Sequence, residues 1–175
     1  MLLLYKKNNM NSLRKWETTS EGKYAFFDSD KEIGSIEISR GTLERVAHAK
    51  IGNQEIIIKK AGIWKSAIEI TDKNGVTIAK AYPEKWYANT IKLDYQGKSY
   101  TLKMRNNPLA EYVIFENEKE IISYGITAKD GKIGVRINSQ QAESDYLLDY
   151  LLWYLFVPIA HENMGDELLF LLLVA

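Results

Sequence analysis

One segment near the C-terminus limits what this chain can fold into more than any other. The run from Tyr146 to Val157 contains a single charged residue, Asp149, and has apolar side chains in every direction around a helix. A helix that packs on the outside of a domain has one apolar stripe and one polar face. We therefore predict that this helix is surrounded by the rest of the protein. Ser144 and Asp145 are suitable caps and Pro158 ends or kinks the helix, so we expect it at about 145–158.

The chain before this segment has the pattern of short β-strands. Apolar and polar residues alternate over 34–39, 91–95, 100–105 and 133–137, which is typical of antiparallel strands with one solvated face. Turn pairs separate such strands, at Gly52-Asn53, Asn74-Gly75, Gln96-Gly97 and Asp130-Gly131. About twelve strands are expected, at roughly 13–18, 23–28, 33–39, 45–51, 54–60, 65–71, 76–82, 90–95, 98–104, 111–116, 120–127 and 132–137.

The strands also form a repeat, with polar turns before Ile33, Val76 and Ile121. The spacing of roughly forty residues is also that of propeller blades, but propellers need about four to eight blades and this chain ends before a fourth. The strands must therefore pair in a single closed or nearly closed sheet. We predict a mainly β protein, an antiparallel closed barrel of about twelve strands around the hydrophobic C-terminal helix, which fills the space that a large barrel leaves.

The predicted barrel occupies 13–160 as one domain, after an N-terminal segment, 1–12. The extension 161–175 ends in the apolar run Leu168–Ala175, which we expect to dock on the domain; an exposed tail that contacts a partner or a membrane is the alternative. Neither this run nor Tyr146–Ala160 has the roughly 17–25 apolar residues of a membrane-spanning helix. We expect no transmembrane span and a cytoplasmic protein, with peripheral membrane contact as the open alternative.

Composition excludes several kinds of chemistry. The 23 Lys and Arg residues balance 23 Asp and Glu residues, so no global field attracts nucleic acid, and we expect no nucleic-acid partner. With no cysteine and only His48 and His161 as imidazoles, thiolate catalysis and cysteine-rich zinc sites are excluded. No nucleotide-binding, hydrolase or metalloprotease motif occurs. We therefore expect no cofactor, no metal site, no catalytic residue and no enzyme activity.

The architecture resembles a known superfamily. The residues that carry the resemblance are the helix Tyr146–Val157, the unit Ile70–Ala79 and the matching earlier unit Phe27–Gly34. Tandem hairpins closed by an apolar C-terminal helix are similar to the tubby C-terminal-like superfamily, which includes tubby proteins, plant LURP-one-related proteins and phospholipid scramblases. The resemblance covers roughly Trp16 to Ile159 and implies membrane-lipid association. The tubby lipid-binding residues align with no particular positions here, and the scramblase cysteine-rich segment is absent.

Four basic residues are the candidate contacts for anionic head groups. Lys103 and Arg105 share the outward face of one predicted strand, and Lys59 and Lys60 end a strand at the equivalent point of the preceding unit. The alternative is that these side chains keep exposed strands soluble. Asp149 is the other notable residue, because a carboxylate on a surrounded helix needs a partner. We expect it near the mouth of the barrel, where water or a lysine reaches it.

Three hypotheses about function remain open from the sequence. The first is a non-enzymatic binding module that associates with anionic membrane lipid head groups. The second is an intracellular small-ligand-binding barrel or an enzyme with an interior pocket, which requires an open lumen. The third is a structural or protein-interaction domain that uses the apolar tail, Leu168–Ala175.

Overall fold

The computed structural model describes residues 14–39, 45–62, 66–85, 90–106, 110–129, 132–140 and 145–159. The predicted terminal segments, 1–12 and 161–175, lie outside these residues. The twelve strands are β1 (Arg14–Ser20), β2 (Lys23–Asp28), β3 (Lys31–Ile38), β4 (Val46–Ile51), β5 (Gln54–Ala61), β6 (Ala67–Asp72), β7 (Thr77–Pro83), β8 (Thr90–Tyr95), β9 (Lys98–Asn106), β10 (Ala110–Glu116), β11 (Lys119–Lys129) and β12 (Lys132–Ser139). One helix follows them at 147–159.

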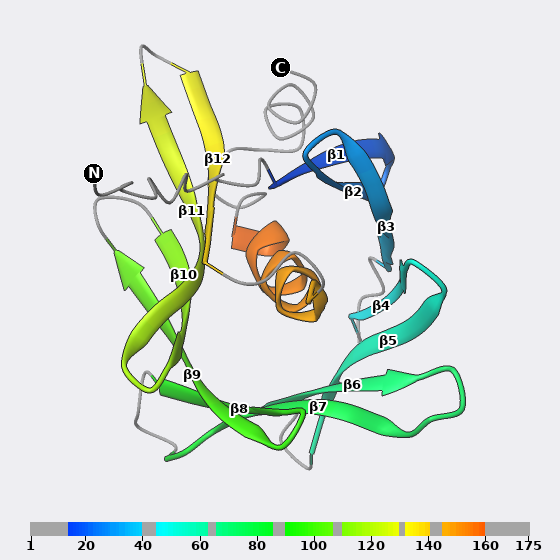
Figure 1. Cartoon of the computed structure of the whole chain (residues 1–175), viewed down its shortest axis with the longest axis vertical. Coiled ribbons are helices and arrows are strands. Elements are labelled where there is room, and N and C mark those ends of the chain that lie inside the picture. The colour runs from blue at the N-terminus through cyan, green and yellow to red at the C-terminus, as the bar shows by residue number, and fades with distance from the viewer. Residues whose placement is uncertain are drawn as a thin grey trace, which may run out of the picture.

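The strands form one antiparallel sheet in which each strand pairs with its neighbours in the sequence, from β1 to β12. The sheet curls around the helix, which lies along the middle of the ring (Figure 1). The two edge strands, β1 and β12, are not paired with each other within the described residues, so the barrel is nearly closed. The predicted fold class is therefore confirmed: a mainly β barrel of twelve antiparallel strands with one C-terminal helix.

The two ends of the barrel are built differently. At one end, tight turns join β2 to β3, β4 to β5, β8 to β9 and β10 to β11. Several of their residues have positive φ, including the non-glycine residues Ser29 at 51° and Asp30 at 66°, as two-residue hairpin turns with the twist of the sheet require. At the other end the connections include the longer segments 39–45, 62–66 and 84–89. The helix begins at the tight-turn end, where Tyr95 Oη donates a hydrogen bond of 3.1 Å to Asp145.

The helix is buried on every side, as its missing polar face predicts. Leu148, Leu151 and Leu152 are fully buried and belong to the same apolar core as the inward side chains of the strands. Trp153 stacks on Trp16 of β1, with ring centroids 5.0 Å apart and an angle of 8° between the rings. Alternation along each strand supplies the apolar inner face, and the helix supplies the apolar filling. Within the described residues this helix is too short to cross a bilayer, and we find no other helix that could do so.

One glycine is required by a close approach between β3 and β4. A Cβ atom on Gly34 would lie 1.9 Å from the backbone oxygen of Lys50 and 2.9 Å from the hydroxyl of Tyr150. The missing side chain lets the Tyr150 hydroxyl donate a hydrogen bond of 3.2 Å to that same oxygen. The helix is thus bonded directly to the backbone of β4.

Candidate functional site

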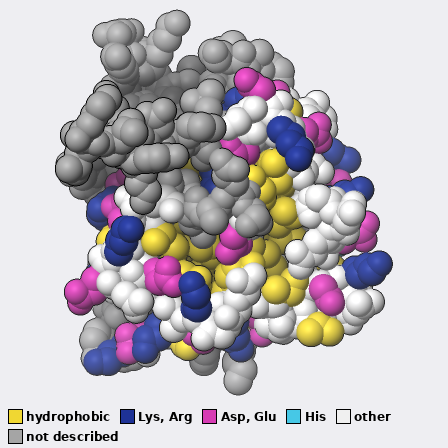
Figure 2. All heavy atoms as spheres, in the orientation of Figure 1, with side chains coloured by type: hydrophobic (Ala, Val, Ile, Leu, Met, Phe, Trp, Pro, Cys, Tyr) yellow, Lys and Arg dark blue, Asp and Glu magenta, His cyan; other side chains and the backbone are white. Residues whose placement is uncertain are grey.

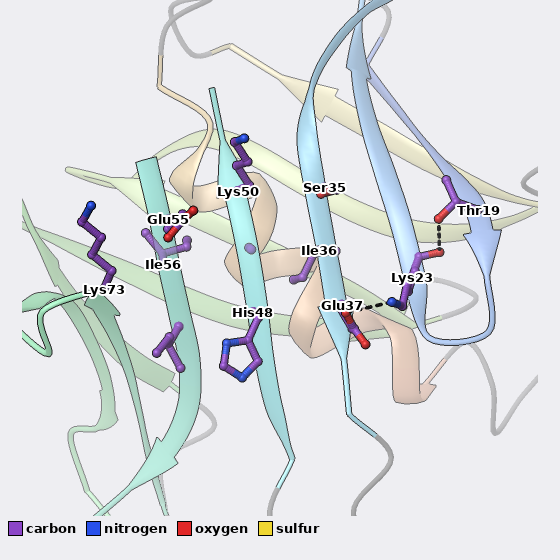
Figure 3. A pocket seen from close by; sticks show the side chains of 12 residues that line it. Thr19, Lys23, Ser35, Ile36, Glu37, His48, Lys50, Glu55, Ile56 and Lys73 are labelled. Atoms are coloured by element: carbon purple, nitrogen blue, oxygen red, sulfur yellow. Dashed lines mark hydrogen bonds and ion pairs between the residues drawn. The ribbon is translucent and has the colours of Figure 1, made fainter. Parts of the chain in front are cut away.

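The hollow that we consider as a binding site lies on the outer face of the barrel, across β2–β5. It has a volume of about 490 Å³, and its lining includes side chains that the strand alternation directs outward. Lysine, glutamate and histidine side chains project from neighbouring strands here (Figure 3). The surface is therefore a polar site outside the core, in contrast to the interior, which the helix occupies.

The register of the strands builds this site from two rows. In the first row, Lys23 of β2 lies opposite Glu37 of β3, and Glu37 lies opposite His48 of β4. The row ends at Ile57 of β5, the partner of His48. Directly opposed residues on one face have Cβ atoms roughly 5 Å apart. Four strands therefore present a continuous strip that runs from a cation to an apolar side chain.

The second row contains the unpaired charges. Lys50 of β4 lies between Ser35 of β3 and Glu55 of β5, and Lys73 reaches the same hollow from the turn after β6. Lys23 forms an ion pair of 3.1 Å with Glu37. We find no ion pair of 4 Å or less for Lys50 or Lys73 within the part of the chain that the structure describes. Neither ammonium group is held in a close ion pair there, although Glu55 lies opposite Lys50 across the two strands.

The helix fixes the position of this hollow. The hydrogen bond from Tyr150 to the backbone oxygen of Lys50 ties the residue that carries one free ammonium group to the core. Tyr150 is buried, and burial raises the pKa of its hydroxyl far above the ordinary value. The hydroxyl therefore stays protonated and remains a donor. The floor of the site is held by a rigid element rather than by a loop.

The four basic residues predicted as head-group contacts lie near one end of the barrel but in two separate pairs. Lys59 and Lys60 are at the end of β5, and Lys103 and Arg105 are at the end of β9, with β6, β7 and β8 between them. At about 4.8 Å per strand, the pairs are roughly 19 Å apart along the sheet. The structure does not bring them into one cluster, and whether either pair binds an anion stays a prediction.

The two pairs of basic residues also differ in how many of their side chains are free of ion pairs with described residues. Lys59, Lys60 and Lys103 are exposed. Arg105 forms ion pairs of 3.0 Å with both Glu111 and Glu120. A guanidinium group held by two carboxylates has little attraction left for an external phosphate group.

Asp149, the single charge of the helix, lies in a buried polar cluster. It accepts hydrogen bonds from Arg14 of β1 at 2.6 Å and from Tyr124 of β11 at 2.8 Å. Trp16 Nε1 donates to the hydroxyl of Tyr124 at 3.0 Å, and Arg14 Nε lies 3.6 Å from Asp28. These contacts join the two edge regions of the sheet, β1–β2 and β11, to the helix.

The expected surroundings of Asp149 are wrong in this respect. Asp149 does lie in the first turn of the helix, but its side chain is fully buried rather than reached by water, and its cation is an arginine far away in the sequence rather than a lysine. Burial raises the pKa of Asp149 to about 7, although Arg14 and Tyr124 act in the opposite direction. The cluster has no access to a substrate, so we assign it to holding the helix in place.

The remaining sequence candidates take structural positions or lie outside the described residues. His48 is on the outer site, whereas His161 is outside the described part of the chain. No group of three potential metal-ligating side chains occurs in the described residues. The outer site itself was missed by sequence reasoning, because the alternation shows which residues face outward but not which residues of neighbouring strands are opposed.

Comparison of the chain with protein-family models, with curated proteins and with solved structures finds no match in any of the three.

Proposed function

We propose that this protein is a non-catalytic binding module that associates with the anionic head groups of membrane lipids through the outer hollow on β2–β5. The observation that carries the proposal is the pair of free ammonium groups, Lys50 and Lys73, in a hollow of about 490 Å³. Two cations that line one hollow attract a phosphate or carboxylate group more strongly than either does alone. The resemblance to the tubby C-terminal-like superfamily supports the same ligand class.

The arrangement of the other charges supports a local site rather than a broad electrostatic surface. Cationic and anionic side chains are interspersed over the face shown in Figure 2, and the formal net charge of the chain is +0. Long-range attraction to an anionic membrane is therefore weak, and affinity depends on a few well-placed lysines. The helix in the interior supports an external ligand over one enclosed by the barrel.

Vesicle co-sedimentation tests this function. Wild-type protein is mixed with phosphatidylcholine vesicles that contain or lack phosphatidylserine, at low and high ionic strength. We expect binding only to the anionic vesicles, and weaker binding as salt increases. In the double variant Lys50→Ser/Lys73→Ser we expect a loss of about 2 kcal/mol, roughly thirtyfold in affinity, at about 1 kcal/mol for each lysine near the surface.

Two matched double variants locate the contact. Lys31 and Lys119 are exposed lysines beside other turns, and Lys31→Ser/Lys119→Ser removes the same charge without touching the hollow. Lys59→Ser/Lys60→Ser removes the same charge at the end of β5. Equal losses in all three variants, or no binding by the wild type, would reject the outer hollow as the site. A loss of vesicle binding only in Lys59→Ser/Lys60→Ser would show that the contact is at the end of β5, as predicted from the sequence, and not in the hollow.

A further inference from the structure

Arg45, directly before β4, is held against the C-terminal half of the helix. Its guanidinium carbon lies 4.1 Å from the ring centroid of Tyr154. The hydroxyl of Tyr154 donates a hydrogen bond of 2.8 Å to the backbone oxygen of Arg45. Stacking and hydrogen bond together fix the orientation of the side chain at the end of the barrel opposite the tight turns.

One edge of this guanidinium group has no partner. Nε and Nη2 of Arg45 are both buried, and neither donates a hydrogen bond. These two nitrogens lie on the same edge of the planar group, the edge with which arginine binds an oxyanion through two parallel hydrogen bonds. A buried donor without an acceptor is costly, and a buried charge without a counter-charge is more so. Arg45 as a whole is only partly buried, although these two nitrogens are themselves buried.

Among the described residues, no carboxylate shifts the pKa of Arg45. Burial lowers its pKa, and the groups that act in the opposite direction are the hydroxyls of Tyr154, Tyr112 and Tyr24. The register also suggests a second cation: Val46 is opposite Lys59, and extending the pairing by one residue puts Lys60 opposite Arg45. Like charges in such positions repel each other.

Arg14 is a buried arginine whose Nε and Nη2 also lack a hydrogen-bond partner, so the two arginines differ in the charges beside them. Arg14 has Asp149 at 2.6 Å and Asp28 at 3.6 Å. Arg45 is comparably fixed but has no acid beside it among the described residues. Among the described residues, two carboxylates lie beside Arg14 and none lies beside Arg45, so Arg45 is the one whose charge is left for an external anion.

We propose that Arg45 and Lys60 form a binding site for a phosphate group, with the Nε–Nη2 edge of Arg45 as its two-pronged donor. A dianionic phosphate suits two adjacent cations better than a single carboxylate does. The site lies at the start of β4 and is independent of the outer hollow, so it does not rest on the proposed function. The phosphate group can belong to a soluble phosphate or to a lipid head group.

Thermal unfolding of the full chain in inorganic phosphate, against chloride at equal ionic strength, tests the site. We expect phosphate to raise the melting temperature of the wild type to a plateau, since a ligand that binds only the folded state stabilises it. Arg45→Lys keeps the positive charge but removes the two parallel N–H donors of the guanidinium group, and we expect it to bind phosphate at least tenfold more weakly. Arg45→Met should abolish the response and, without phosphate, should melt at the same or a higher temperature than the wild type. Lys119→Met is the matched control and should respond as the wild type does.

A second arm distinguishes the source of the phosphate. Glycerol phosphate and vesicles of phosphatidic acid in phosphatidylcholine carry the same group in soluble and membrane-bound form. A response to either that is lost in Arg45→Met supports the site, and Lys50→Ser/Lys73→Ser should retain it even if that variant loses binding to phosphatidylserine. An equal response to chloride and phosphate, or the same phosphate response in wild type and Arg45→Met, would overturn the proposal.

Discussion

One cation and two carboxyl groups meet beside the first turns of the helix. Because the carboxyl groups outnumber the cation, the free energy of unfolding should depend on pH. Arg14 lies between Asp149 and Asp28, and the groups around Asp149 also include Tyr124 of β11 and Asp145 at the start of the helix. With both Arg14-bound carboxylates ionised, a negative charge is left in a buried site. A protonated Asp149 leaves Arg14 with one counter-charge. The pKa of Asp149, raised by burial to about 7, favours the second state below neutral pH.

The sign and size of the effect follow from this shift. The ordinary pKa of the carboxyl group is 3.8, and in the folded protein it is about 7. As pH rises, the unfolded chain releases this proton first, so the contribution of Asp149 to stability is complete below about pH 4 and is lost by about pH 7. At about 1.4 kcal/mol for each pKa unit, the loss is about 4 kcal/mol.

The substitution Asp149→Asn isolates this contribution, because the amide has the shape of the protonated acid and cannot ionise. Urea unfolding from about pH 4 to pH 8, followed by the fluorescence of the stacked Trp16 and Trp153, gives the free energy of unfolding at each pH. We expect the difference between wild type and Asp149→Asn to move by about 4 kcal/mol in favour of the variant across this range.

An exposed carboxylate provides the control. Asp94 accepts hydrogen bonds of 2.8 Å from Ser99 and Tyr82, and these bonds lower its pKa. A carboxyl group with a lowered pKa stabilises the folded state at neutral pH, and this stabilisation is lost only when the pH falls through that pKa. The free energy of unfolding of Asp94→Asn should therefore differ from that of the wild type by a constant amount between about pH 5 and 8. A difference for Asp149→Asn that is equally constant would refute the reasoning, since it would mean that Asp149 stays ionised throughout.

Two further predictions concern the packing of the helix and the sheet, and both are measured by urea unfolding. Leu152→Ala, in the fully buried middle of the helix, should cost about 2–5 kcal/mol because it leaves a cavity that the rigid barrel cannot close; a cost below about 1 kcal/mol would contradict the tight filling. Gly34→Ala should cost about 3 kcal/mol or more, because its Cβ would overlap the backbone oxygen of Lys50. Gly97 is a turn glycine with φ of 72° and open space around it, so Gly97→Ala should cost only about 1 kcal/mol. Equal costs at the two glycines would contradict the close approach of β3 to β4 at Gly34.

The elements could be predicted because their signals are local. Strand alternation and turn pairs place strands where the structure has them, and Gly52-Asn53, Asn74-Gly75 and Gln96-Gly97 lie at described turns. The helix, expected at about 145–158, is found at 147–159. Its burial followed from the absence of a polar face. Asp130-Gly131 lies outside the described residues.

The contacts between distant segments could not be predicted in the same way. Asp149 and Arg14 are 135 residues apart, and no local pattern shows that the first residue of the sheet reaches the helix. The outer hollow requires the register of four strands, which depends on bulges such as the one between Phe26 and Phe27. A shift of one residue exchanges the faces of a strand, so residue types alone cannot place Lys50 beside Ser35 and Glu55.

Both proposed anion sites lie at β4, and the helix holds this strand at both ends. Tyr150 and Tyr154 are four residues apart, so they share one face of the helix. Their hydroxyls donate to the backbone oxygens of Lys50 and Arg45, at the end and just before the start of β4. The side chains of these two residues, Lys50 on the outer face and Arg45 at the barrel end, form no ion pair of 4 Å or less within the described chain. A helix that only filled the interior would need no hydroxyl groups aimed at one strand, so its second role is to fix the backbone from which the two cations project.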